Sequence, residues 1–153
     1  MAFNDDGWFG NIMNDMYPVE MIVNNTNLSV KTCSYLDLFI TIQHGKFIFK
    51  LFDKRKQFNF NVISYPFICG NVPRMPTYGI YISQLIRFCH VNCKFENFKQ
   101  DVTDLTQKLI NQGFKVELLS KKFDKFYYSY IHLWSKFGKE LMEYKNTFLN
   151  WVG

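Results

Sequence analysis

YLDLFITIQHGKFIFKLFDKR, residues 35–55, is the stretch that decides the fold. Two apolar runs lie on either side of Gln43-His44-Gly45. A short break that contains glycine between two such runs predicts an antiparallel β-hairpin. Lys46 and Lys50 lie four positions apart in the second run, so they share one face of its strand. The stretch therefore predicts a hairpin with one apolar face and one face that offers cations to a polyanion.

The segments around the hairpin differ from it in composition. Residues 1–30 form a polar lead, and residues 31–65 hold the hairpin, with a weak alternation at 58–63 that is consistent with a third strand. Residues 66–77 read as a connection because prolines and a glycine interrupt any helical pattern, namely Pro66, Gly70, Pro73 and Pro76.

Residues 78–153 predict four helices, because apolar residues recur there at the helical period. The first begins near Thr77, the second ends at Gly113, the third runs from about Glu117 to Phe137, and the fourth follows Gly138. Short connections between the helices favour an up-and-down bundle. The expected fold class is α+β, with a β-hairpin or small antiparallel sheet followed by a three- to four-helix bundle.

Two cysteines fall on the apolar side of the first predicted helix. Cys89 and Cys93 are four positions apart, but the sequence holds no second pair of similar spacing. A structural zinc site usually needs two such pairs. We therefore expect both thiols to lie in the core and expect no metal site.

Composition and charge narrow the possible function classes. The chain has 153 residues, of which 48% are hydrophobic and 19% aromatic, so a disordered protein is excluded and one domain is expected. No apolar run approaches the roughly 20 residues that span a bilayer, and the start of the chain lacks a basic, secretory-type leader. We expect an intracellular protein, cytoplasmic or nuclear, without a membrane partner. The net charge of +5 is concentrated in residues 46–100, which suits a nucleic-acid backbone.

Several blocks occur in an order that resembles a known family. They are Phe52-Asp53-Lys54-Arg55, Asn59-Phe60-Asn61-Val62-Ile63, the run from Tyr78 to Arg87, and the run from Lys108 to Phe114. With them, the chain resembles the carboxy-terminal part of reverse transcriptases from animal retroelements, in the Penelope-like or non-LTR group. The resemblance extends from about Asn4 to about Leu149.

The resemblance implies that two parts of the chain have different roles. It makes residues 31–65 the edge of a palm, after the catalytic turn, and residues 78–153 a helical thumb. The metal-binding aspartates of such enzymes would lie upstream, so no catalytic residue is expected here and Asp5 and Asp6 are expected to form a solvated turn. The chain would bind no cofactor itself, although the parent enzyme uses Mg²⁺, and it would be inactive as a polymerase alone. The implied partners are an RNA–DNA hybrid or primer–template and the missing upstream palm and fingers.

Basic side chains are the predicted contacts to nucleic-acid phosphates. They come from the hairpin and the segment after it, from the first helix, and from the third helix: Lys46, Lys50, Lys54, Arg55, Arg87, Lys121, Lys122 and Lys125. Solvated basic faces are also common in proteins without such partners. The alternative function is therefore a non-enzymatic protein-interaction module derived from a retroelement, in which the charge is incidental.

Overall fold

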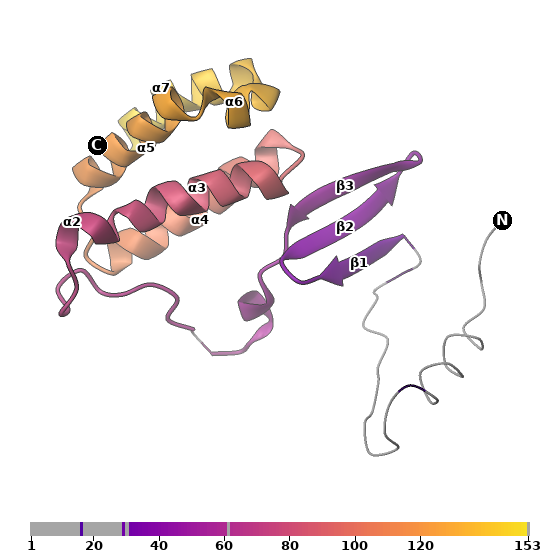
Figure 1. The fold of residues 1–153 in the computed structure, drawn as a ribbon, viewed down its shortest axis with the longest axis horizontal. Helices are drawn as coiled ribbons and strands as arrows, with labels where there is room; N and C mark the ends of the chain where they lie inside the picture. Colours follow the sequence, from indigo (N-terminus) through magenta and orange to yellow (C-terminus); the bar gives the residue numbers. More distant parts are fainter. Residues whose placement is uncertain (1–15, 17–28, 30, 61, 153) are drawn as a thin grey trace.

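The computed structural model describes Met16, Ser29, residues 31–60 and residues 62–152. It has an α+β fold in which a small antiparallel sheet precedes a set of helices, as the sequence predicts. Figure 1 shows that the sheet extends beyond one end of the helices and that the segment after it runs back beneath them.

The sheet consists of β1 (Thr32–Tyr35), β2 (Leu38–Gln43) and β3 (Lys46–Leu51), hydrogen-bonded in that order. His44 and Gly45 join β2 to β3 with φ angles of 49° and 73°. Two consecutive positive φ angles are the signature of the tight turn that matches the twist of a hairpin. The predicted hairpin is confirmed.

The third strand is not where the sequence suggested. The described residues of 58–63 form no strand, and β1 occupies the third place in the sheet. After β3, Oδ1 of Asp53 accepts a hydrogen bond from the backbone N–H of Arg55 and caps the 3₁₀-helix η1 (Lys54–Gln57). This turn carries the chain away from the edge of β3, so the predicted strand has no partner there.

Strand pairing assigns the side chains of the sheet to two faces, because residues alternate along a strand and paired residues share a face. We call one the lysine face; its members are Thr32, Ser34, Phe39, Thr41, Gln43, Lys46, Ile48 and Lys50. We call the other the apolar face; its members are Cys33, Tyr35, Leu38, Ile40, Ile42, Phe47, Phe49 and Leu51.

The helical part contains most of the core. Its elements are α2 (Arg74–Thr77), α3 (Gly79–Val91), α4 (Phe95–Asn111), α5 (Val116–Ser129), α6 (Ile131–Trp134), η2 (Ser135–Phe137) and α7 (Lys139–Val152). Buried aromatic side chains fill the space between α3, α4, α5 and α7, and the largest fully buried ones are Tyr81, Phe98, Phe123, Phe126 and Phe148. Within the described residues, no helix is both long and apolar enough to cross a membrane.

The predicted third helix is broken in two. Its residues form α5, α6 and η2, with the break at Tyr130, whose φ of −122° and ψ of 35° lie outside the helical region. The indole N–H of Trp134 donates to the backbone oxygen of Tyr127 at 2.8 Å, and the two rings stack with centroids 4.5 Å apart. This contact folds α6 back on the end of α5, which one continuous helix could not allow.

Two smaller predictions also need correction. Cys89 is buried as expected, but Cys93 is exposed because α3 ends at Val91 and Asn92 is extended.

One helical turn, α2, lies within the connection in which prolines were expected to prevent any helix. Pro76 is its third residue, where the backbone N–H would have no partner inside the helix, so proline is tolerated.

Candidate nucleic-acid interface

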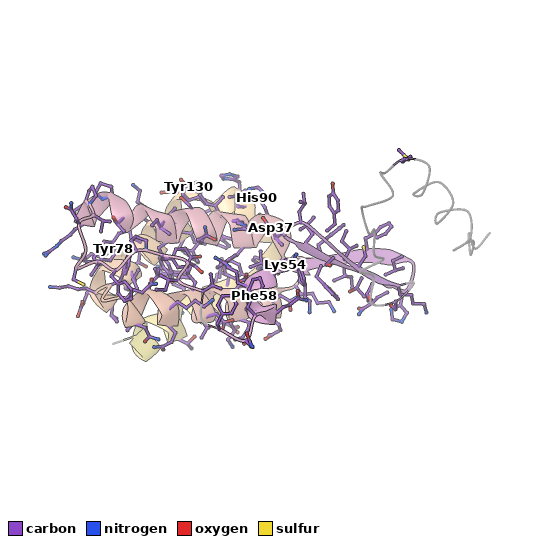
Figure 2. All side chains as sticks on the ribbon, turned by 90° about the horizontal axis from the view of Figure 1, so that it is seen from below. Asp37, Lys54, Phe58, Tyr78, His90 and Tyr130 are labelled. Atoms are coloured by element: carbon purple, nitrogen blue, oxygen red, sulfur yellow. The ribbon has the colours of Figure 1, made fainter. Side chains whose placement is uncertain are left out.

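A cleft of about 400 Å³ lies where the sheet meets the helices, between the β1–β2 turn, η1, α3 and α4. Figure 2 shows Asp37 and Lys54 at this junction. Three of the predicted contact residues line the cleft, namely Lys54, Arg55 and Arg87. The other charged side chains of its wall are Lys56, Lys108, Asp37, Asp53, Asp101 and Asp104. Cations and carboxylates are therefore almost balanced inside the cleft.

Arg55 forms an ion pair with Asp53, the residue whose carboxylate caps η1. Its Nε lies 2.7 Å from Oδ1 of Asp53, and its Nη2 lies 3.1 Å from Oδ2. Burial alone would raise the pKa of Asp53, but the hydrogen bonds and the charge of Arg55 hold that pKa below its usual value. A bidentate pair of this kind leaves Arg55 less available to a phosphate than the sequence suggested.

Arg87 is also engaged. Its Nη2 lies 2.6 Å from Oδ2 of Asp37, so the ion pair joins the C-terminal half of α3 to the β1–β2 turn. Leu36, beside Asp37, has a φ of 52°, which marks this turn as tight. Both side chains of the pair are substantially exposed, so an anionic ligand in the cleft can compete with Asp37 for Arg87.

The lysine face continues into the cleft through two aromatic rings. Phe52 lines the cleft and stacks on Phe39 with ring centroids 6.3 Å apart. The Nζ of Lys50 lies 4.7 Å above the Phe39 ring. Lys46 shares this face, and Lys54 follows the end of β3. Within the described residues, these three lysines are exposed and form no salt bridge.

A buried asparagine fixes the sheet to the cleft wall. The side chain of Asn92 is fully buried; its Oδ1 accepts the N–H of Leu51 at 3.2 Å, and its Nδ2 donates to Asp101 at 2.8 Å. Burial raises the pKa of Asp101, and the bond from Asn92 and the charge of Lys56 offset this only in part. Lys56 in turn lies 2.9 Å from Asp104. These groups position β3 and η1 against α3 and α4.

Sequence reasoning missed Asn92, Asp101 and Lys56. The available signal was weak: Asn92 follows the last apolar turn of the first predicted helix, a place where asparagine often caps a helix end. Its contact with Leu51 spans 41 residues, and no local pattern reveals such a partner.

The remaining predicted contacts form a separate group. Lys121 and Lys125 are exposed on α5, whereas Lys122 is half-buried, and none of the three lines the cleft or belongs to the sheet. Asp5 and Asp6 lie outside the described residues. Among the described residues, no group of three or more His, Cys, Asp or Glu side chains could hold a metal ion.

No family model matches the chain, and comparisons with curated proteins and with solved structures find no significant match.

Proposed function

We propose that this chain binds the phosphate backbone of nucleic acid through the lysine face and the mouth of the adjoining cleft. The observation that carries the proposal is the row of Lys46, Lys50 and Lys54, which are exposed and free of salt bridges within the described residues. Phosphate contacts of this kind supply most of the sequence-independent affinity for nucleic acids.

The preferred ligand in this proposal is an RNA–DNA hybrid or primer–template, as in the reverse transcriptases that the sequence resembles. The protein would act as the palm edge and thumb of such an enzyme, and the chemistry of polymerisation would belong to the upstream palm. Mg²⁺ is then a cofactor of the parent enzyme, and this chain alone holds the duplex without extending it.

Titration of a fluorescently labelled hybrid with the purified chain tests the proposal. Anisotropy at several salt concentrations should give an affinity that falls steeply with salt, because each neutralised phosphate releases counterions. A hybrid should bind at least as well as a DNA duplex of equal length, and base sequence should have little effect. Absence of binding even at low salt would overturn the proposal.

One observation favours the alternative, a non-enzymatic protein-interaction module. Phe58 and Phe60 are 47% and 63% exposed, and their rings stack with centroids 5.1 Å apart. Exposed aromatic pairs are common in protein–protein contacts. If the hybrid does not bind while Phe58→Ser and Phe60→Ser abolish a measured self-association, the alternative is the better account.

A further inference from the structure

Two exposed aromatic rings follow the cationic turn η1. Phe58 and Phe60 are 47% and 63% exposed, and their rings stack with an interplanar angle of 23°. The backbone N–H of Phe58 donates to the carbonyl oxygen of Arg55 at 3.3 Å, so the pair begins directly at the end of η1. Stacked rings that remain exposed offer a flat apolar surface to a planar ligand.

The segment that carries the rings is also cationic. Residues 54–60, KRKQFNF, are exposed throughout and contain no carboxylate. Lys54 forms no salt bridge within the described residues, whereas the other two cations pair with carboxylates outside the segment. Figure 2 shows Lys54 and Phe58 beside each other at the junction of the sheet and the helices. A protein partner would account for the rings but not for the cations that precede them, so nucleic acid is the better match.

We propose that Phe58 and Phe60 stack on unpaired bases of a strand that extends beyond the duplex. The inference rests on the proposed function and defines its ligand more closely, as a primer–template with a single-stranded extension rather than a fully paired hybrid. Bases inside a duplex are already stacked on both sides, whereas an unpaired base presents a free face to an aromatic side chain. Such stacking tolerates any base, because every base has a flat face.

The neighbouring polar groups fit the same ligand. Lys54 can contact a phosphate of the strand as a point charge. Gln57 and Asn59 are exposed beside the rings, and their amides can both donate to and accept from the edges of unpaired bases. Cations with interleaved aromatic side chains are the combination by which proteins bind single strands.

Three RNA–DNA hybrids with the same paired sequence test the proposal on the purified chain. One is blunt, the second carries about six unpaired nucleotides on one strand, placed in turn at each end, and the third carries an abasic extension of the same length. The abasic extension keeps the phosphates and lacks the bases, so the two extended hybrids differ only in what can stack. Fluorescence anisotropy should show that the extension with bases binds about tenfold more tightly than the abasic one.

Phe60→Leu should remove most of this preference, because leucine keeps an apolar side chain but has no ring to stack on a base. Phe60→Tyr keeps the ring and should retain the preference. Phe47→Leu is the matched control, since Phe47 is 64% exposed and also stacks on a phenylalanine two positions away, but lies on the apolar face of the sheet. It should bind like the parent. Circular dichroism should show that all three variants keep the parent's fold.

Equal affinity of the parent for the two extended hybrids would overturn the inference, and so would a preference that survives in Phe60→Leu. Loss of a measured self-association in Phe60→Leu, without a change in base preference, would assign the rings to a protein contact instead. The blunt hybrid separates the two proposals. Its failure to bind counts against the proposed function, whereas the comparison of the two extended hybrids decides the stacking role by itself.

Discussion

Arg87 on α3 and Asp37 in the β1–β2 turn form an ion pair across the mouth of the cleft, with Nη2 of Arg87 2.6 Å from Oδ2 of Asp37. The arginine and aspartate side chains are 39% and 66% exposed, so solvent screens the pair and its contribution to folding is small. If the proposed interface binds phosphates, the larger effect of this pair would be on ligand binding, because Asp37 neutralises an arginine that a phosphate would otherwise contact.

Asp37→Asn should therefore strengthen the binding of an RNA–DNA hybrid. The change frees Arg87 and removes a negative charge, so affinity should rise by about threefold and the salt dependence should steepen by about one unit. Fluorescence anisotropy at several salt concentrations measures both. Glu140→Gln, which removes an exposed charge on α7, serves as the control and should change little. Weaker binding by Asp37→Asn would contradict this role for the pair.

Asn92→Ala should destabilise the protein by about 2–4 kcal/mol. It leaves the N–H of Leu51 without its acceptor and Asp101 without its donor, and each buried group that loses its partner is costly. Urea unfolding, followed by circular dichroism, gives the free energy of unfolding. Asn111→Ala, at the exposed end of α4, should lie within about 0.5 kcal/mol of the parent. Equal stability of the two variants would show that Asn92 does not hold the sheet in place.

Asp101→Asn should remove a pH dependence of stability. The pKa of Asp101 is higher in the folded protein than in the unfolded chain. Its neutral form therefore stabilises the folded state fully below the unfolded pKa of about 4, and this stabilisation is lost as the pH rises through the folded pKa. Asparagine keeps an acceptor for Asn92 but does not ionise. The free energy of unfolding of the variant should therefore rise relative to the parent between about pH 4 and pH 7. A relative fall over that range would mean that the pKa of Asp101 is lowered instead.

Gly113→Ala and Gly79→Ala should have opposite effects on stability. Gly113 has a φ of 86°, and a Cβ there would lie 3.1 Å from Cγ2 of Ile68, so alanine should cost about 1–2 kcal/mol. Gly79 begins α3, and an added Cβ meets nothing within 4 Å, so alanine should stabilise by about 0.5 kcal/mol. Thermal unfolding of the two variants tests both signs. Two shifts in the same direction would show that one of these backbone assignments is wrong.

The features that the sequence pattern predicts correctly are those that are determined by residues adjacent in the sequence. The β2–β3 hairpin follows from His44-Gly45 between two apolar runs, and the end of α4 follows from Gly113, whose φ is positive as expected. Both depend on a few adjacent residues. The α+β class follows from the change of apolar period near Tyr78.

The features that the sequence did not predict depend on distant partners. The break at Tyr130 arises because Trp134 bonds back to Tyr127, although the apolar pattern continues through it. The placement of β1 depends on pairing with β2, since its four residues carry little pattern of their own. In the candidate interface, Arg55 and Arg87 were recognised as cations, but their engagement by Asp53 and Asp37 becomes visible only in three dimensions.

The salt dependence of hybrid binding by a Lys46→Ala, Lys50→Ala, Lys54→Ala variant tests the central proposal most directly. A control, Lys115→Ala with Lys139→Ala, removes two exposed lysines that lie outside the sheet and the cleft. If the lysine face binds the backbone, the triple variant should lose affinity at least about tenfold, and its salt slope should flatten by about two to three units. The control should stay close to the parent protein. A triple variant that remains folded and keeps the parent's affinity and slope would contradict the proposal.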